Sequence, residues 1–334
     1  MGRVGFLSLK DFFGRSGRGV IVSRQPRQNP MKLHRHEFFE VVLVLSGEGI
    51  HNAKGFRHRI GKGDVLFLDP RSSHGYEETE DLSLLNILIR DDALARIGRE
   101  LGDLPGYHVL FGLQPDPKEA GFRRRLRLSA EEAEQIDDWA GRIEEAVPSH
   151  GAARLIETAY LTLIVDVLSR KYGRERGKAP RPASPERTRL RMGRLLGWID
   201  SHLASPCAVG QMAERIGMSE STFHRAFRAA TGLSPHAYLL RARLTRAARL
   251  LAEPEWAGET IAAVAAACGF GDSNHFSRAF GRFAGCSPRA WRKRAVGTQG
   301  QSVGKILPLR RAFAGTKSSQ ASVRKGAAGR PSAL

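Results

Sequence analysis

The sequence predicts an α+β protein with two domains, an N-terminal antiparallel β-barrel and a C-terminal all-α domain that carries two helix-turn-helix motifs. Three observations predict this arrangement. Short apolar segments separated by glycine and proline fill residues 31–90, as in small barrels. From residue 129 onward, apolar residues recur at helical spacing. In the last third of the chain one helical pattern occurs twice, and an internal repeat identifies an architecture more firmly than a single motif.

Composition narrows the classes of function. The chain has 334 residues, enough for two domains, and a formal net charge of +19. Residues 186–294 hold 17 basic and 8 acidic residues, and residues 295–334 hold 7 basic and no acidic ones. This distribution predicts a domain that binds a polyanion. Three scattered cysteines, no signal-peptide pattern and no apolar run of about 18 residues predict a cytoplasmic protein with reduced thiols and no membrane partner.

The N-terminal domain begins with a basic arm, residues 1–30, which is expected either to be disordered or to fold over a ligand. Segments rich in β-branched and apolar residues are predicted to be strands: residues 38–45, 65–68 and 82–89. Residues 46–49 (SGEG) are expected to form a turn. Residues 91–128 are mixed, and their arginine cluster at 123–127 is expected on a solvated face.

Four residues of the predicted barrel carry metal-ligating or hydrogen-bonding side chains: His34, His36, Glu40 and His74. The first three have the same parity, so on one strand they would point to one face. Imidazole and carboxylate groups can hold Fe, Mn, Ni or Zn. They can also exchange hydrogen bonds with a sugar-like ligand, or they can be structural residues. The residues alone leave these three interpretations open.

Two helices are predicted after the barrel. Ser129 and Glu132 form a capping box at the start of the first. Residues 152–172 form the second, whose apolar stripe is expected to comprise Leu155, Ala159, Thr162, Ile164 or Val165, and Leu168. Residues 173–189 are rich in proline, glycine and charge and are expected to be a linker.

Residues 269–291 are predicted to form the second half of a helix-turn-helix. Gly269 and Phe270 make the turn, and Asp272 or Ser273 caps the next helix. Phenylalanines at spacings of 4 and 3 give this helix one apolar stripe: Phe276, Phe280 and Phe283. Polar residues occupy its outward face: Ser273, Asn274, Ser277 and Arg278. Such a face suits the major groove, where Asn pairs with adenine and Arg with guanine.

The same pattern occurs 53 residues earlier. Phe223-x-Arg225-Ala226-Phe227 matches Phe276-x-Arg278-Ala279-Phe280, and Tyr238 matches Trp291. The outward face of this first copy carries four polar residues: Ser221, Thr222, His224 and Arg225. A helix of about 27 Å, starting at Pro235, is expected to hold the two copies about one DNA turn, or 34 Å, apart. Its arginines are expected to contact phosphates or acids: Arg241, Arg243, Arg246 and Arg249.

Residues 209–294 resemble the DNA-binding domain of the AraC family of bacterial transcription regulators. The resemblance rests on three motifs, Met212-Ala213-x3-Gly217-Met218-Ser219, Arg243-Leu244-x2-Ala247-x2-Leu250-Leu251, and Gly269-Phe270 through Ser287-Pro288. Trp291 departs from the tyrosine that is usual in the family. The His34-x-His36-x3-Glu40 pattern with His74 resembles the two cupin motifs. Residues 75–90 are similar to the sensor domains of rhamnose-responsive AraC-type activators.

These resemblances imply a domain plan. A cupin-like effector-binding domain with its arm spans residues 1–128, and a helical dimerisation segment spans 129–172. After the linker at 173–189, the DNA-binding domain spans 190–294. A disordered basic tail, residues 295–334, ends the chain.

The resemblances also imply a function: a sequence-specific transcription regulator, a sugar-responsive activator that acts as a homodimer. Its expected partners are promoter or operator DNA, a small-molecule effector and RNA polymerase, with no cofactor and no enzyme activity. The alternative is a metal-dependent cupin enzyme fused to a DNA-binding domain, with its metal on His34, His36, Glu40 and His74. A DNA-repair methyl acceptor would need a metal-held cysteine cluster, for which Cys207, Cys268 and Cys286 are too scattered.

Overall fold

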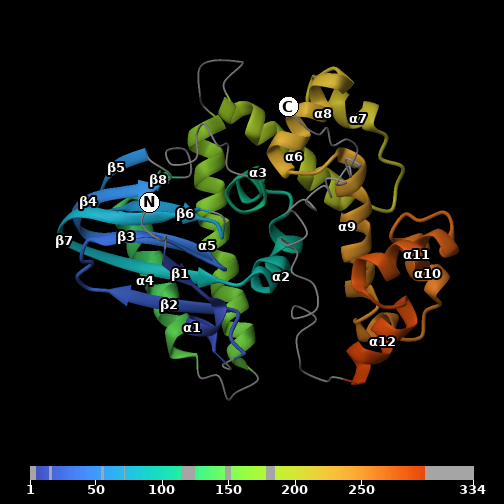
Figure 1. Ribbon diagram of the computed structural model, residues 1–334, viewed down its shortest axis with the longest axis horizontal. Helices are drawn as coiled ribbons and strands as arrows, with labels where there is room; N and C mark the ends of the chain where they lie inside the picture. Colours follow the sequence, from blue (N-terminus) through green and yellow to red (C-terminus); the bar gives the residue numbers. More distant parts are fainter. Residues whose placement is uncertain are drawn as a thin grey trace, which may run out of the picture.

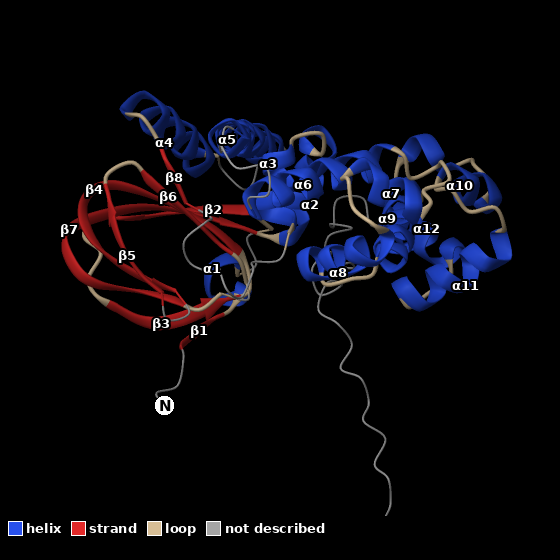
Figure 2. Ribbon diagram, turned by 90° about the horizontal axis from the view of Figure 1, so that it is seen from above, coloured by secondary structure: helices blue, strands red, loops and turns tan. Residues whose placement is uncertain are grey.

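A curved β-sheet, a layer of helices against its outer face and a group of small helices beside them make up the protein (Figures 1 and 2). The structure is a computed structural model that describes residues 5–14, 17–53, 56–70, 72–113, 125–146, 152–177 and 185–297. No helix within these ranges is both long enough and apolar enough to cross a membrane.

The sheet has eight strands. They are β1 (Gly5–Leu7), β2 (Val20–Gln25), β3 (Met31–His36), β4 (Phe39–Ala53), β5 (Phe56–Gly61), β6 (Asp64–Leu68), β7 (His74–Ile89) and β8 (Arg125–Arg127). Their order is β1-β3-β7-β4-β6-β8, with β2 paired to β7 and β5 paired to β4. The long strands β4 and β7 bend and change partners along their length, which closes the sheet into a barrel-like curve (Figure 2).

The strands predicted at residues 65–68 and 82–89 lie within β6 and β7, and the one predicted at 38–45 lies within β4 except for Phe38. The turn predicted at residues 46–49 is wrong, because β4 runs through it with shifts of register. Gly47 has a φ of 70°, and a Cβ there would lie 2.2 Å from the carbonyl oxygen of Asp81. Gly47 therefore allows a β-bulge within β4 and does not end the strand.

The N-terminal arm is folded from Gly5 onward within the described residues. It forms β1, a short helix α1 (Leu9–Phe13) and β2. β1 pairs in parallel with β3, and β2 pairs with the second half of β7. Of the two expectations for the arm, disorder is therefore wrong for these elements.

The two faces of β4 have different surroundings. Phe39, Val41 and Leu43 pack against the helices, whereas Val42 and Val44 belong to an apolar cluster on the inner face. Alternate residues of a strand point to opposite faces, so Glu40 shares the inner face with the two valines.

The helical layer contains α2 (Asp91–Leu101), α3 (Pro105–Tyr107), the π-helical turn η1 (His108–Gly112), α4 (Ala130–Glu145) and α5 (Ala152–Gly177). The capping box of Ser129 and Glu132 opens α4 as predicted. Arg125, from the cluster expected to be solvated, instead forms an ion pair of 2.6 Å with the buried Asp64. Arg123 and Arg124 lie outside the described residues.

The stripe predicted for α5 is partly wrong. Leu155 is 72% exposed and Ala159 is exposed as well. Ile164, Val165 and Leu168 are buried as predicted, and five residues outside the predicted stripe complete the buried face: Ala153, Glu157, Leu161, Ser169 and Tyr172. Glu157 can lie on that face because Nε of Arg18 (2.8 Å) and the main-chain N–H of Gly19 (3.0 Å) donate to its carboxylate.

The C-terminal domain contains α6 (Pro185–Ser201), α7 (Val209–Arg215), α8 (Glu220–Thr231), α9 (Pro235–Leu250), the 3-10 turn η2 (Pro254–Trp256), α10 (Ile261–Ala267), α11 (Ser273–Ala284) and α12 (Pro288–Gly297). The predicted linker is mostly helical, because α5 runs to Gly177 and α6 begins at Pro185. Residues 178–184, and the predicted tail from 298 onward, lie outside the described residues.

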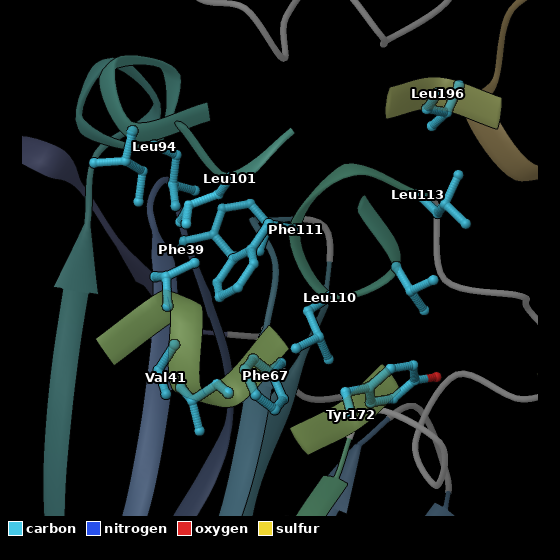
Figure 3. Packing of buried hydrophobic residues seen from close by; sticks show 14 of the residues in the cluster. Phe39, Val41, Phe67, Leu94, Leu101, Leu110, Phe111, Leu113, Tyr172 and Leu196 are labelled. Atoms are coloured by element: carbon cyan, nitrogen blue, oxygen red, sulfur yellow. The ribbon is translucent and has the colours of Figure 1, made fainter. Parts of the chain in front are cut away.

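The hydrophobic core is divided differently from the predicted domains. One cluster runs from the sheet through α6, α7 and α8 to Leu239 in α9, whereas the last three helices pack with the second half of α9 in a separate cluster. Figure 3 shows Phe111 packed beside Phe39, and Leu113 between Leu110 and Leu196 of α6. The first helix-turn-helix therefore shares its core with the barrel.

Two glycines of α6 make this contact close. A Cβ at Gly193 would lie 2.5 Å from the carbonyl oxygen of Pro105, and one at Gly197 would lie 2.4 Å from that of Gly102. Both distances are too short for any side chain larger than hydrogen. The backbone of α6 therefore rests directly on the turn between α2 and α3.

Candidate DNA-binding and effector sites

Two helix-turn-helix units are present, α7–α8 and α10–α11. Each has a turn glycine in the left-handed region, Gly217 with φ 66° and Gly269 with φ 80°. Asp272 caps α11, since its carboxylate accepts from the main-chain N–H of Asn274 (2.8 Å) and His275 (3.1 Å). These hydrogen bonds lower the pKa of Asp272 and hold the first turn of α11 in place.

Equivalent aromatic residues fill the cores of the two units. In the first, Phe227 meets Tyr238 edge to face at 5.4 Å. In the second, Phe280 meets Trp291 in the same way at 6.0 Å, and Nε1 of Trp291 donates to the carbonyl oxygen of Ala248 at 2.9 Å. Tryptophan therefore occupies the position of the usual tyrosine and satisfies its own buried N–H.

The outward faces of α8 and α11 carry the residues predicted to contact DNA. Seven are exposed, namely Ser221, Thr222, His224, Arg225, Ser273, Asn274 and Arg278, and Ser277 is half-buried. Figure 2 shows α8 and α11 on the same side of α9. α9 has 16 residues, so it is about 24 Å long, somewhat shorter than expected.

The arginines of α9 have different surroundings. Arg243 donates to the carbonyl oxygens of Leu203 and Ser205, each at 2.9 Å, so main-chain carbonyl groups and not acids are its partners within the domain. A phosphate contact by this residue stays a prediction. Arg241, Arg246 and Arg249 line a cleft of about 610 Å³ between α9 and the barrel domain. Burial in this cleft lowers the pKa of Arg241 to about 10.

The structure brings the four predicted residues of the barrel together on the inner face. They come from three strands, because His34 and His36 lie on β3, Glu40 on β4 and His74 on β7. The expectation that the first three share one strand is therefore wrong. Nε2 of His36 lies 3.1 Å from Oε2 of Glu40, and Nε2 of His74 lies 3.6 Å from the same oxygen. The ring of His34 lies 4.2 Å from that of His74.

Three of these four residues can share one metal ion. Ligand atoms of His36, Glu40 and His74 lie within 4.8 Å of one another. Nδ1 of His36 donates to the carbonyl oxygen of Phe38 at 2.7 Å, which leaves Nε2 to face Glu40. A divalent cation bound between these two residues would satisfy that contact. His34 is not in the group, and its Nδ1 donates to the carbonyl oxygen of Lys32 at 3.2 Å.

Sequence reasoning missed two residues beside this cluster, His51 on β4 and Tyr76 on β7. They are register partners across the two strands. Their rings lie 5.5 Å apart, and the ring of His51 lies 5.7 Å from that of His74. A strand that ended at residues 46–49 could not include His51. The turn predicted there therefore prevented the assignment of His51 to the barrel. Continuing β4 through its bulge would have placed His51 in the barrel.

The comparisons with known proteins agree with this architecture. The profile of the "AraC-like ligand binding domain" family matches residues 20–161, and that of a "Helix-turn-helix domain" family matches residues 212–294. The chain is 31% identical over 286 residues to the HTH-type transcriptional activator RhaS of Enterobacter sp., covering 85% of this chain and 95% of the relative. It belongs to the AraC family of transcription regulators. It is 30% identical over 283 residues to RhaS of Escherichia fergusonii, with the same two shares.

Two solved structures have a limited similarity to the chain. The DNA-binding domain of AdpA in complex with a target DNA is 32% identical, covers 34% of this chain and 98% of its own, and has a TM-score of 0.31. ToxT of Vibrio cholerae bound to an unsaturated fatty acid is 10% identical, covers 84% of this chain and 96% of its own, and has a TM-score of 0.33.

As an AraC-family member, the protein is a DNA-binding transcription regulator with a separate ligand-binding domain. Around Glu40, the inner face of that domain is lined by histidines. Burial lowers the pKa of His51 to about 3 and lowers those of His34 and His74, so these imidazoles are neutral near pH 7. Each neutral ring offers one N–H donor and one acceptor.

The arm lies next to this AraC-type ligand-binding face. Gly5 pairs with His34 and Leu7 pairs with His36 along β1 and β3. Phe12 and Phe13 of α1 pack edge to face on Phe38, at 5.3 and 5.9 Å. Phe38 in turn stacks on His36 at 4.5 Å. A change in the position of His36 can therefore be transmitted to α1 through the ring of Phe38.

Proposed function

We propose that this protein activates transcription in the cytoplasm in response to a sugar, binding operator DNA as a homodimer and contacting RNA polymerase. One observation carries the DNA-binding part: two equivalent helices, each with exposed polar residues, lie on the same side of α9 (Figure 2). In this proposal Ser221, Thr222, His224 and Arg225 contact one groove segment. Ser273, Asn274, Ser277 and Arg278 contact the next.

The spacing of α8 and α11 defines the operator that this proposal expects. Two helices held by one rigid spacer contact successive major grooves, so each protomer recognises two short elements about one helical turn apart. Selection of bound duplexes from a random DNA pool by the full-length protein tests this. Enrichment of two elements with a centre-to-centre spacing of about 10 base pairs is expected. Enrichment of a single element, or of none, would contradict base recognition by both helices.

The homodimer is supported by the outward face of α5. Leu155 is 72% exposed and Leu163 is 43% exposed, and exposed Ala159 lies between them at helical spacing. An apolar stripe on a surface helix is typical of an interface, and a two-fold axis would pair it with itself. A dimer also lets the affinities of two weakly bound operator halves combine.

The sugar response is supported by the chemistry of the inner face. Glu40 accepts hydrogen bonds, and the neutral histidines around it both donate and accept, which suits the hydroxyls of a sugar. Reporter transcription from the selected operator, with and without single monosaccharides, tests the response. A rise with one sugar, lost in Glu40→Ala, is expected. No rise with any sugar would refute a sugar effector while leaving the DNA-binding proposal intact.

The route from sensor to DNA is supported by the shared core. α2 begins two residues after β7 ends, and its turn toward α3 supports Gly197 of α6. A displacement of β7 by the ligand is therefore passed through α2 to the first helix-turn-helix. A ligand shifts such an equilibrium only if it binds the two arrangements with different affinity.

A metal-dependent activity is a second candidate, because His36, Glu40 and His74 bring three ligand atoms together. Elemental analysis of the purified protein tests it. About one equivalent of transition metal, lost together in Glu40→Ala and His74→Ala, would favour this candidate. The cysteines give no comparable site, since all three are free and none belongs to a metal-ligand group of the described residues.

A further inference from the structure

His51 and Tyr76 form a second polar pair on the inner face, next to the cluster around Glu40. They are buried, with 2% and 4% of their surface exposed. Their rings contact each other and that of His74, so they extend the cluster by one step along β4 and β7. Neither residue was recognised from the sequence, and neither is needed to hold the strands together, since main-chain hydrogen bonds do that.

The polar atoms of this pair point to a missing partner. Within the described residues, no protein group forms a hydrogen bond with Nδ1 or Nε2 of His51 or with Oη of Tyr76. Buried polar groups are nearly always paired, because leaving them unpaired is costly. The apolar residues packed with Tyr76 cannot supply a partner: Val42, Val44, Ile60, Leu66, Leu68, Leu82 and Leu84. A hydroxyl-bearing ligand can.

The charges around the pair restrict what that ligand can be. Among the described residues of the barrel, the buried polar and charged ones include three acids and no lysine or arginine: His34, His36, Glu40, His51, Asp64, Asp69, Ser72 and His74. A carboxylate or phosphate bound there would lie beside the Glu40 carboxylate, and Arg125, the cation that acts on His51, is already paired with Asp64 at 2.6 Å. An uncharged ligand meets no such penalty.

We infer that His51 and Tyr76 complete the effector site and make it select an uncharged, hydroxyl-rich ligand over its anionic derivatives. The inference rests on the proposed sugar response and adds two binding residues and a rule of selectivity to it. Glu40 accepts from one pair of ligand hydroxyls, and the pair of His51 and Tyr76 exchanges hydrogen bonds with others. The apolar cluster beyond Tyr76 contacts the less polar edge of the ligand.

Calorimetric titration of the full-length protein tests this. The probes are L-rhamnose, L-fucose, L-arabinose, D-xylose and D-mannose, each paired with its aldonate. The neutral sugar that binds most tightly is expected to bind at least tenfold more tightly than its aldonate. Tyr76→Phe and His51→Leu are each expected to weaken it about tenfold, and His51→Gln is expected to recover part of the loss.

Thermal melting without sugar at pH 7.5 separates binding from a structural role. Tyr76→Phe and His51→Leu remove unpaired buried polar groups, so their melting temperatures are expected to equal or exceed that of the wild type. Tyr160→Phe, on α5 outside the barrel, is the matched control and is expected to change neither binding nor melting.

The possible results distinguish the roles of His51 and Tyr76 from the sugar response on which those roles depend. A neutral sugar that binds the wild type and both variants equally overturns the role of His51 and Tyr76 alone. Preference for an aldonate overturns the selectivity rule but leaves a sugar-acid response in place. No binding by any neutral sugar overturns the sugar response and this inference together.

Discussion

Arg249 of α9 donates a hydrogen bond from Nη2 to the main-chain carbonyl oxygen of Ala95 on α2, at 3.1 Å. The two residues are 154 positions apart, one in each domain. α2 follows directly from β7, whose first residues, His74 and Tyr76, face the proposed effector site. This hydrogen bond therefore ties the second half of α9 to the helix that follows β7.

We expect Arg249→Met to reduce the ratio of reporter transcription with effector to that without it by at least threefold. Methionine keeps the aliphatic part of the side chain but cannot donate the hydrogen bond. A movement of α2 is therefore no longer transmitted to the second helix-turn-helix. Arg246→Met, on the same helix and in the same cleft, is the matched control and should keep the wild-type ratio. An unchanged ratio in Arg249→Met would show that coupling does not use this contact.

Arg225→Ala and Arg278→Ala should each weaken operator binding 10- to 100-fold. A bidentate arginine–guanine pair accounts for about 1–3 kcal/mol of discrimination between bases. Binding to unrelated DNA should change far less, because phosphate contacts elsewhere are unaffected. Fluorescence anisotropy at one fixed salt concentration measures both affinities. Equal losses on both DNAs would mean that the arginine contacts the backbone, and Arg174→Ala, an exposed arginine on α5, is the control.

Leu155→Glu combined with Leu163→Glu should convert the proposed dimer to a monomer. Two carboxylates on each copy of the stripe would repel one another across a two-fold interface and would lose their hydration there. Sedimentation velocity measures the mass. Glu131→Lys and Glu134→Lys on α4, exposed and away from the stripe, should leave it unchanged. A wild-type protein that sediments as a monomer at micromolar concentration would contradict the proposal.

Gly197→Ala should destabilise the protein by about 1–3 kcal/mol, because its methyl group would meet the carbonyl oxygen of Gly102 at 2.4 Å and force α6 away from α2. Gly173→Ala, in α5, is the matched control: nothing lies within 4 Å of its added Cβ. That variant should be more stable than the wild type by about 0.5–1 kcal/mol, since alanine favours the helix. Urea unfolding measures both, and similar values for the two variants would argue against close contact at Gly197.

Stability should fall as the pH drops below about 6.5. Burial lowers the pKa of His51 from 6.5 to about 3, and those of His34 and His74 in the same direction. The unfolded chain binds protons at these residues near pH 6.5, whereas the folded protein does not. The stability is therefore complete above pH 6.5 and is lost as the pH falls toward the lower folded pKa. For His51 the loss is about 1.4 kcal/mol per pH unit between the unfolded and the folded pKa.

Urea unfolding at pH 7.5, 6.5 and 5.5 measures that dependence. In His51→Leu one of these histidines is gone, so the slope below pH 6.5 should be smaller by about one proton. The same slope in this variant and in the wild type would show that His51 is protonated in the folded protein.

Local patterns predicted the helix-turn-helix units well. The Asp272 cap, the turn at Gly269 and the aromatic stripe of α11 involve residues within a few positions of each other, so the sequence shows them directly. The strand cores within β4, β6 and β7 were predicted for the same reason.

Long-range contacts explain what the sequence did not reveal. Glu157 belongs to the buried face of α5 only because Arg18 and Gly19 approach it from 138 or more residues away. Gly47 is compatible with both a turn and a bulge, and the pairing of β4 with β7 decides between them. The predicted set of His34, His36, Glu40 and His74 was brought together, but His51 and Tyr76 depended on that same pairing.

The shared core has a practical consequence for the engineering of chimeras, in which a ligand-binding domain of this kind is joined to a new DNA-binding domain. A chimera joined in the linker between α5 and α6 would pair a foreign α6 with the turn beneath Gly193 and Gly197, and almost any side chain at those positions would block docking. A junction inside α9, between Leu239 and Leu244, falls where one apolar cluster gives way to the other. Exchange at that point should yield hybrids that keep the ligand-binding domain, the first helix-turn-helix and the packing contacts between them.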